Sequence, residues 1–414
     1  MNILVIHETE YIKKMVFEYQ IIPEIWASKG HRVFVIDFET KWQKSGLFDF
    51  ISRTKTIKNV KRAGKKKGVT LIRPGFIKIP VISRVSAAIN HYSVIKNTIL
   101  KYKIDVMFLY SVPTNGLQAI RAARVCKIPV YFRLLDVLHQ LVPYKILSWP
   151  TYMMERLAYR KVDELTAITP KLTKYAIDLG ADIRTTSYLP TGYDADLFFP
   201  KPKDAELMAR YKINKTDQVV VFAGTLYNFS GLDLVLKYFA KHIAEFAHTR
   251  FLIIGHGQQE DEFKKIVKQN RLEKNVIMTG FIDYKLLNNY LNLADICINP
   301  FAINKITDII FPSKIYQYLA CGKPVIATRL PGLIDIFPDN NGKNNIYYYD
   351  ADKIEELFRL VKKIKKIRIK DRSSSLQQVA KILVDRLEKL KDIGKKATRK
   401  IGRGTLLDLK HIAK

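Results

Sequence analysis

The chain has 414 residues, 48% of them hydrophobic, which suits two domains with sizeable cores. Its 70 Lys and Arg residues against 39 Asp and Glu residues leave a formal net charge of +31, which indicates an anionic partner. Three scattered cysteines exclude a disulfide framework and a thiolate zinc site, and no stretch is apolar enough to span a membrane. We therefore expect a reducing compartment and a soluble or peripheral protein.

Short runs rich in Val, Ile and Phe alternate with segments of helical periodicity, a pattern typical of βαβ units and parallel sheets. The chain begins with such a run, and acidic residues interrupt it, so we expect a strand there and not a signal peptide. The first series of predicted strands is Ile3–Ile6, Arg32–Ile36, Val69–Ile72, Val106–Tyr110, Val130–Leu135 and Glu164–Ile168. The second series is Val219–Ala223, Arg250–Ile254, Val276–Thr279, Ile296–Asn299 and Val325–Thr328.

The stretch Leu189–Pro200, dense in Pro, Gly and Asp, separates the two series and predicts a domain boundary. We assign residues 1–195 to a first Rossmann-like domain, residues 196–370 to a second, and residues 371–414 to a basic amphipathic tail.

Two segments are strongly basic. Arg53–Arg73 holds cations throughout and no acidic residue, and in the tail many cations surround and follow an apolar stripe at helical spacing. The residues of that stripe are Leu376, Val379, Ala380, Leu383, Leu387 and Leu390. We predict that both segments dock on an anionic lipid surface, while the alternative for each is an ordinary solvated charged surface.

Two glycine-containing turns lie between predicted strands and helices in the second half of the chain. Such turns expose backbone N–H groups and a positive helix end to phosphate. The residues of these turns that we predict to bind a phosphorylated ligand are Gly224, Thr225, Ser230, Gly231, Gly255, His256 and Gly257. For His256, tolerance of the turn explains the residue as well as a phosphate contact does.

A helix is predicted to begin at Pro312 and Ser313 and to end at Gly322. Lys314 and Gln317 lie three residues apart on its first turn and face the same way, so they direct a cation and an amide at one ligand. We therefore add Ser313, Lys314 and Gln317 to the predicted site.

These motifs occur in an order that resembles the donor-binding half of family 4 glycosyltransferases. The segments that carry the resemblance are Phe222–Thr225, Ile254–Gly257, Asn275–Phe281, Ala294–Asp295, Pro300–Phe301 and Pro312–Val325. Segments of the first half, Ala27–Val35 and Ala167–Leu172, extend the similarity over most of residues 1–350. The resemblance implies an α/β GT-B fold of two Rossmann-like domains, with a nucleotide-sugar donor in the second domain and an acceptor in the first. It also implies no metal, no cofactor, and transfer with retention of anomeric configuration.

The chain departs from the family pattern at several positions. Thr225 and Ser230 stand where the family commonly carries an Arg and a Lys for the diphosphate. Gln317 replaces a Glu that binds ribose, and a second acid would fall at Ile309. We expect Lys314 to supply the missing positive charge, with Lys305 as a second candidate.

On the acceptor side, the strand at Val130 ends in Arg133, Asp136 and His139. We predict that Asp136 takes part in catalysis by holding a sugar hydroxyl or orienting the acceptor. His139 is the other catalytic candidate, with a packed or solvent-facing histidine as the alternative. His7 and Glu8 follow the first strand and are candidates by position only.

We therefore expect a glycosyltransferase at the inner face of the cell membrane, peripheral and cytoplasmic, with a lipid-linked or glycan acceptor. Two other classes stay open. The missing cations suit a non-catalytic nucleotide-sugar-binding partner subunit, which turnover by the isolated chain would exclude. The charge suits a nucleic-acid-binding protein, although no recognised module of basic and aromatic residues occurs.

Overall fold

The computed structural model describes residues 1–12, 15–38, 50–79, 82–113, 115–142, 145–304, 307–308, 311–364 and 375–411. The chain forms two compact units: Met1–Pro190 with Gln377–Lys414, and Thr191–Leu376. The boundary between the two units lies within the predicted boundary stretch Leu189–Pro200, after residue 190 and not after residue 195. The tail clusters with the first unit instead of forming a third part.

The first unit is built on an eight-stranded sheet in the order β10-β9-β8-β7-β1-β2-β5-β4, parallel except for β4. Its strands are β1 (Asn2–Ile6), β2 (Arg32–Ile36), β4 (Lys55–Val60), β5 (Val69–Arg73), β7 (Val106–Leu109), β8 (Val130–Leu134), β9 (Glu164–Ala167) and β10 (Thr186–Tyr188). A separate antiparallel pair consists of β3 (Ile51–Ser52) and β6 (Phe76–Ile77). The six predicted strands are all present. Their continuous apolar runs are explained by burial on both faces of a parallel sheet.

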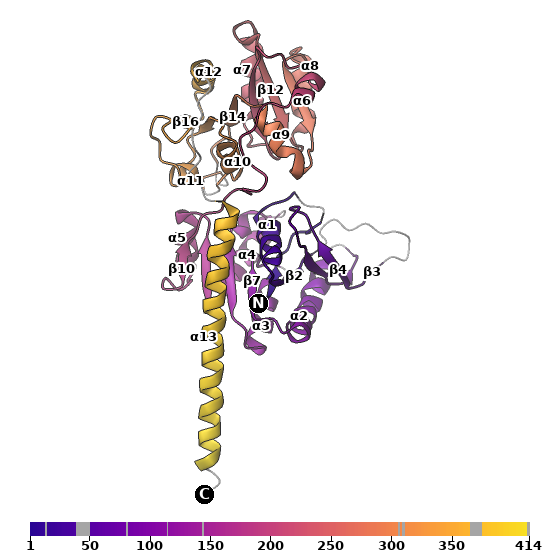
Figure 1. The fold of residues 1–414 in the computed structure, drawn as a ribbon, viewed down its shortest axis with the longest axis vertical. Helices are drawn as coiled ribbons and strands as arrows, with labels where there is room; N and C mark the ends of the chain where they lie inside the picture. Colours follow the sequence, from indigo (N-terminus) through magenta and orange to yellow (C-terminus); the bar gives the residue numbers. More distant parts are fainter. Residues whose placement is uncertain are drawn as a thin grey trace. The chain divides into compact units, whose positions relative to one another are not determined.

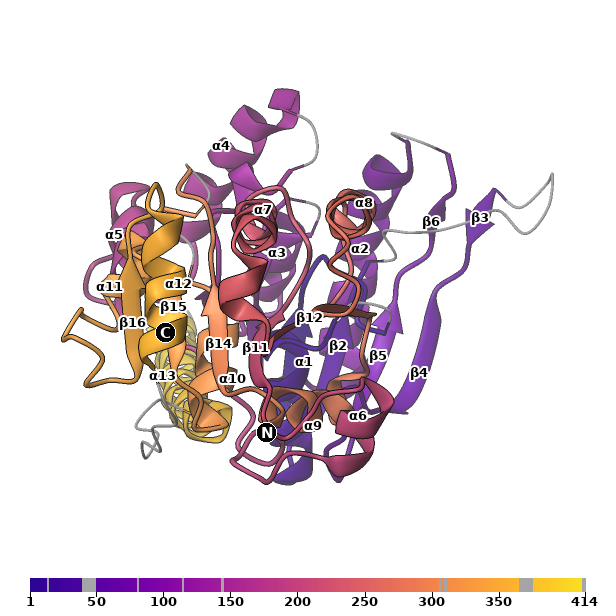
Figure 2. The same cartoon turned by 90° about the horizontal axis from the view of Figure 1, so that it is seen from above.

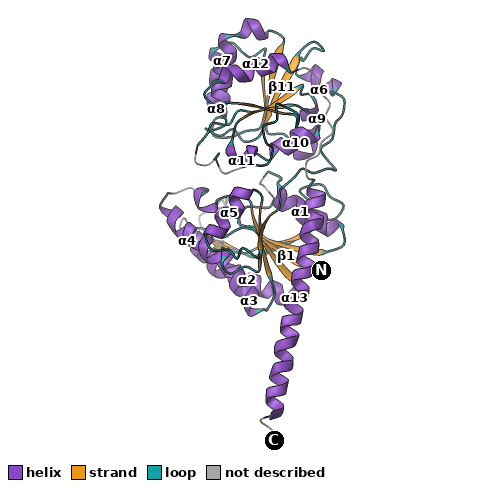
Figure 3. Cartoon of the chain, turned by 90° about the vertical axis from the view of Figure 1, so that its left-hand side faces the viewer, coloured by secondary structure: helices purple, strands orange, loops and turns teal. Residues whose placement is uncertain are grey.

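Helices cover both faces of this sheet (Figure 3). On one side lie α1 (Glu18–Ser28) and α13 (Leu376–His411), and on the other the helices α2 to α5. The bounds of the latter are α2 (Ile82–Tyr102), α3 (Gly116–Val125), α4 (Ser148–Tyr159) and α5 (Pro170–Asp178), with short 3₁₀ turns η1 (Leu138–Gln140) and η2 (Lys145–Leu147) before α4.

The second unit has a six-stranded, fully parallel sheet in the order β13-β12-β11-β14-β15-β16. Its strands are β11 (Gln218–Ala223), β12 (Thr249–Ile254), β13 (Val276–Gly280), β14 (Ile296–Asn299), β15 (Val325–Thr328) and β16 (Ile346–Tyr349). One face carries α7 (Leu232–Lys241), α8 (Glu260–Gln269) and α12 (Ile354–Lys363), and the other α9 (Leu287–Asn292) and α10 (Lys314–Ala320) (Figure 2). The remaining short helices are α6 (Ala205–Arg210), η3 (Ile243–Phe246), η4 (Tyr284–Leu286) and α11 (Pro331–Ile334).

Helix α13, the basic tail, is a structural part of the first unit (Figure 1). All six residues of the predicted apolar stripe are buried. Trp26 Nε1 donates a hydrogen bond to the Ala380 carbonyl at 2.8 Å, and Arg386 pairs with Glu164 at 2.9 Å. The prediction that this stripe faces a lipid surface is wrong, because the stripe completes the core of the first unit. Truncation before Leu376 therefore removes core residues and is no clean test of membrane docking.

The other basic segment, Arg53–Arg73, forms the exposed edge strand β4 and its turn into β5. Arg73 is buried and pairs with Asp37 at 2.7 Å, and Lys65 is also buried, so these two cations are withdrawn from the surface. The exposed members are Arg53, Lys55, Lys58, Lys61, Lys66 and Lys67. Lysines on an edge strand also discourage pairing with another sheet, which explains part of the charge without a ligand.

In each sheet, strands that follow one another along the chain are added first toward one edge and then toward the other. This change in strand order occurs at one central pair of strands. In the first unit this pair is β1 and β7, and in the second it is β11 and β14. Ligands of open parallel sheets bind at the carboxyl ends of the strands at such a reversal. The two strand pairs therefore mark where a binding site is expected in each unit.

Candidate active site

In the second unit, two glycine turns lie side by side at the carboxyl ends of β11 and β12. Gly224 N donates to Ile254 O at 2.9 Å, and Leu226 N donates to His256 O at 3.2 Å. Gly255 has a φ of +131°, and a Cβ there would collide with the carbonyl of Gly224. Both turns thus require glycine for their own packing. The donor-binding roles of Gly224, Gly255 and Gly257 stay predictions, and the exposed His256 contacts only the edge of Phe281 among the described aromatic rings.

The turn that leads into α7 packs against the end of β14. Gly231, with a φ of +68°, precedes α7, and a Cβ there would overlap the carbonyl of Pro300. Phe229 O accepts a hydrogen bond from Ala302 N at 2.9 Å. These contacts bring the α7 N-terminus to the reversal point between β11 and β14.

Three polar side chains at this point have buried atoms with no hydrogen-bond partner among the described residues. They are the Ser230 hydroxyl, both amide atoms of Asn299 and the Lys314 ammonium. Lys314 Nζ lies 3.7 Å from the ring centroid of Phe222 and 4.2 Å from that of Phe301. A Cβ added to Gly224 would stand 3.2 Å from the same nitrogen.

The Lys314 ammonium is buried inside the second unit. Because its ammonium is removed from water and faces two aromatic rings, with no ion-pair partner among the described residues, burial lowers the pKa of Lys314 well below its usual value. An unpaired cation is costly inside a protein, and an incoming anion would relieve that cost.

The remaining predicted residues lie near this cluster of Ser230, Asn299 and Lys314. Thr225, Ser313 and Gln317 are half-buried. Ser313 precedes α10 without capping it through its side chain, and Gln317 lies one turn after Ser313. Lys305 and Ile309 lie outside the described residues.

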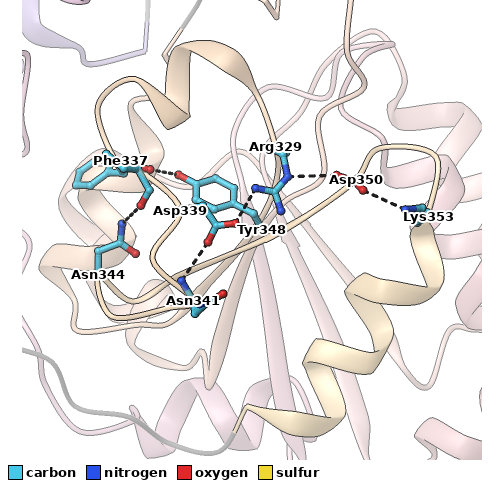
Figure 4. A network of polar contacts seen from close by, with 9 residues as sticks. Arg329, Phe337, Asp339, Asn341, Asn344, Tyr348, Asp350 and Lys353 are labelled. Atoms are coloured by element: carbon cyan, nitrogen blue, oxygen red, sulfur yellow. Dashed lines mark hydrogen bonds and ion pairs between the residues drawn. The ribbon is translucent and has the colours of Figure 1, made fainter.

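Nearer one edge of the same sheet, the polar groups around β15 and β16 pair with one another (Figure 4). Arg329, which follows β15, bonds to Asp339 at 2.6 Å and to Asp350 at 3.2 Å, and Lys353 also contacts Asp350 at 3.2 Å. Tyr348 donates to the Phe337 carbonyl at 2.6 Å. The ends of β15 and β16 are thus electrostatically satisfied, whereas the ends of β11 and β14 are not.

In the first unit, a cavity of about 1000 Å³ opens at the carboxyl ends of β1, β7 and β8. Its polar residues at the sheet edge include His7, Glu8, Tyr110, Ser111 and Asp136. His7 and Glu8, candidates by position, are therefore brought together with Asp136. Tyr110 and Ser111 are additions whose only sequence signal is their position directly after a buried strand.

Two titratable groups of this cavity are strongly perturbed. Asp136 is half-buried, makes no ion pair with another described residue, and desolvation raises its pKa to about 7. Burial lowers the pKa of His7 to about 4, so its ring is neutral at physiological pH. His7 Nδ1 lies 3.2 Å from Thr9 Oγ1, while its Nε2 has no partner among the described residues. Asp136 is thus the group of this pair whose charge changes near neutral pH.

His139 is held away from the cavity lining. Its Nδ1 lies 2.8 Å from Glu155 Oε2 and 3.1 Å from the Tyr175 hydroxyl. The buried Glu155 also accepts from Leu138 N at 3.0 Å, so it fixes the backbone of the loop after Asp136. The role of Glu155 was not predicted, because the sequence of a helix does not show which loop a Glu side chain on it contacts. His139 is anchored as the packed alternative requires, and its catalytic role stays a prediction.

Arg133 is also internal. Its guanidinium bonds to Glu18 at 2.7 Å and to the carbonyls of Leu189 at 2.6 Å and Pro190 at 3.1 Å. Both charged side chains are fully buried, so Arg133 ties α1 and β8 to the end of the first unit and does not face a ligand.

No group of three or more His, Cys, Asp or Glu side chains among the described residues is arranged to hold a metal ion. Metal independence stays a prediction. Likewise, no helix in the described part of the chain has the length and apolar composition to cross a bilayer.

The two parallel, helix-covered sheets define a GT-B fold, as predicted. HepE of Anabaena, solved in complex with UDP and glucose, has a TM-score of 0.63 and 16% sequence identity, over 96% of this chain and 99% of that one. A finer match concerns the second unit, where residues 217–366 fit the family described as "Glycosyl transferases group 1".

Two curated relatives point the same way. The phosphatidylinositol N-acetylglucosaminyltransferase GPI3 subunit of Saccharomyces cerevisiae is 22% identical over 162 residues, which are 39% of this chain and 34% of that protein. The alpha-monoglucosyldiacylglycerol synthase of Acholeplasma laidlawii is 22% identical over 273 residues, 63% of this chain and 66% of that one. The chain thus aligns with only about a third of the yeast subunit. The solved structure shows the likeness of fold, and the family match covers residues 217–366 only.

Proposed function

We propose that the protein transfers a sugar from a nucleotide-sugar donor, held by the second unit, to a hydroxyl of an acceptor held by the first. One observation carries the donor half: Ser230, Asn299 and Lys314 have buried polar atoms at the β11/β14 reversal that find no partner among the described residues. A diphosphate with its ribose supplies both the anion and the hydroxyl groups that these side chains lack. The UDP in HepE supports this class of ligand.

The chemistry requires that charge on the departing diphosphate be stabilised. Lys314 and the backbone N–H groups at the start of α7 are the groups that would do so, without reorganisation at the moment of reaction. We identify no dedicated nucleophile in the described site. Retention would then come from attack by the acceptor hydroxyl on the face that the diphosphate leaves, with Asp136 orienting that hydroxyl.

For the acceptor we propose a lipid-linked sugar or phosphate, reached at the inner face of the cell membrane. Much of the cavity beyond His7 and Asp136 has an apolar lining, which a free sugar does not need. The names of both curated relatives include a lipid: phosphatidylinositol in one, diacylglycerol in the other.

Thermal unfolding in the presence of a panel of sugar nucleotides tests the donor half, because a ligand that binds the folded state raises the melting temperature. A stabilising donor is then assayed for turnover with lipid extracts, with and without EDTA, and the anomeric configuration of the product is determined by NMR. We expect turnover that EDTA does not reduce and a retained configuration. Inversion, or activity restored only by Mg²⁺ or Mn²⁺, contradicts the mechanism.

A second candidate is a partner subunit that binds the nucleotide sugar without turning it over. Thr225, Ser230 and Gln317 favour it, because they replace two cations and an acid of the resembled family. Donor binding without turnover by the isolated chain on any acceptor would select this alternative.

A further inference from the structure

The cavity of the first unit is walled by apolar stripes from two helices. On α2 the stripe is Val85, Ala88, Ile89 and Tyr92, and on η2 and α4 it is Leu147, Pro150, Thr151 and Met154. Both sets follow the spacing i, i+3, i+4, i+7, which places them on one face of each helix. Residues in such stripes are usually buried against another element. Here they line an open cavity.

The rim of this cavity exposes several large apolar side chains to solvent. Ile89 and Val85 on α2 are 71% and 59% exposed, and in η2 and α4 Ile146 and Trp149 are 83% and 71% exposed. We define the apolar rim as the exposed lining residues Val85, Ile89, Leu141 and Leu147, together with Ile146 and Trp149, which directly precede the lining residues Leu147 and Pro150 in the chain. Scattered exposed apolar residues are normal, but a group around one cavity marks an interaction surface.

We propose that the apolar rim enters the headgroup and acyl-chain boundary of a membrane, and that the apolar chain of the acceptor passes from there into the cavity. The identification of that chain as part of the acceptor rests on the proposed function. This surface replaces the α13 stripe, which is buried, as the apolar element of membrane contact.

The chemistry of the cavity favours an amphiphile over a protein segment. The lining combines His7 and Asp136, beside which we propose that a sugar or phosphate group binds, with the apolar side chains of α2, η2 and α4. Exposed cations lie beside the rim: Lys145 begins η2, and Arg121 of α3 lines the cavity. Apolar side chains flanked by cations, with an exposed Trp, suit the interface of an anionic bilayer.

Insertion and electrostatic docking make different predictions about salt. Attraction of the β4 cations to anionic lipid weakens as salt screens the charges, whereas burial of apolar side chains does not. If the rim inserts, part of the binding therefore persists at high salt and on neutral vesicles.

Trp149 is a built-in reporter for the test. The full chain is mixed with vesicles of phosphatidylcholine, alone or with phosphatidylglycerol, at low and high salt, with and without brominated acyl chains. We expect a blue shift of the emission and quenching by the brominated chains, both strongly reduced in Trp149→Phe. Binding to anionic vesicles without quenching of Trp149 overturns the proposal.

Matched substitutions separate the rim from exposed apolar residues in general. Ile89 and Ile183 belong to the same unit and are each 71% exposed, but only Ile89 lines the cavity. Ile89→Asp should weaken binding to neutral vesicles by about tenfold or more, since an apolar side chain is no longer buried in lipid, and Ile183→Asp should not. Equal loss in the two variants overturns the proposal.

The acceptor part is tested with alkyl glycosides of increasing chain length. Their affinity should rise by roughly tenfold for each two methylenes in the wild type, and should lose this dependence in Ile89→Asp while thermal stabilisation by the donor is unchanged. No dependence on chain length overturns the lipid chain in the cavity. The vesicle and glycoside binding measurements need no sugar transfer, so absence of turnover contradicts the proposed function alone.

Discussion

The two units share one architecture, a mostly parallel sheet covered by helices, but they differ at the carboxyl ends of their central strands. In the second unit the reversal point holds three groups of buried polar atoms that have no hydrogen-bond partner in the described part of the chain: Ser230 Oγ, the Asn299 amide and Lys314 Nζ. In the first unit the equivalent point opens into a cavity of about 1000 Å³ with large apolar walls. The same topology thus carries two different features, buried polar atoms in one unit and a largely apolar cavity in the other.

The difference shows what each kind of ligand requires of a sequence. A phosphate-binding site is commonly made of backbone turns and a few polar residues in fixed order, which leaves a sequence motif, and the glycine turns described above lie within residues 217–366, which match a family. The wall of an apolar cavity can be built from many combinations of apolar residues, so no sequence motif identifies it. Four substitutions or sets of substitutions test this contrast, starting with the largest expected effect.

Leu383→Ala should lower the free energy of unfolding by about 2–5 kcal/mol, because it opens a void where α13 packs in the first unit. Ile393→Ala is the control on the same helix, since Ile393 is exposed, and should change stability by less than about 0.5 kcal/mol. Chemical denaturation measures both. Similar values for the two variants would mean that α13 is only an appendage.

Lys314→Met should reduce kcat/KM by about 10²–10³, because the diphosphate loses a preorganised cation. The melting temperature of the unliganded protein should be unchanged or higher, since methionine keeps the packing against Phe222 and removes an unpaired buried charge. Steady-state kinetics and calorimetry test this pair of effects. A destabilised variant with wild-type activity would show that Lys314 is a packing residue.

Asn299→Ala should weaken donor binding by about tenfold, the scale of one or two lost hydrogen bonds, without loss of stability. Asn292 is the matched control, because its side chain bonds to Phe199 O, Asn288 O and Lys201 N. Asn292→Ala should lower stability while its donor affinity, measured by calorimetric titration below the melting temperature, stays near that of the wild type. The reverse pattern would remove Asn299 from the donor site.

Turnover should rise with pH up to a plateau above about 7 if the Asp136 carboxylate orients the acceptor, because desolvation raises its pKa to about 7. Asp136→Asn should be less active and lose this dependence. Since the raised pKa favours the protonated form in the folded protein, the wild type should lose stability relative to Asp136→Asn as pH rises from about 4 through about 7. Identical pH profiles would exclude Asp136 from the reaction.

Much of the fold could be predicted because its strands are buried on both faces. Runs such as Ile3–Ile6 and Val219–Ala223 have no polar interruption, and their spacing with helical segments fixes the parallel class. The edge strand β4 was not predicted, because its exposed Lys residues hide the alternation. The apolar stripe of α13 was recognised, but spacing alone does not tell whether a protein core or a lipid covers it.

The candidate site could be predicted only where backbone geometry dictates residue type. Glycine at positions 224 and 255 follows from positive φ and close packing. The burial of Lys314 could not be read from its position on the helix, since Phe222 and Phe301 come from other segments. Glu155, which anchors His139, comes from a helix that follows the loop it fixes, and only the fold reveals that contact.

Helix α13 has a consequence for the order in which the chain acquires its structure. The first unit is assembled from segments on both sides of the second, and Trp26 reaches Ala380 across 354 positions of sequence. During synthesis the second unit, which is continuous, emerges before α13 is made. Until α13 is synthesised, the surface of the first unit that it covers stays exposed. Because this contact joins residues far apart in the sequence, its formation is slow. The second unit is in effect a domain inserted into another, and the outer domain can be completed only after the inserted one has been synthesised.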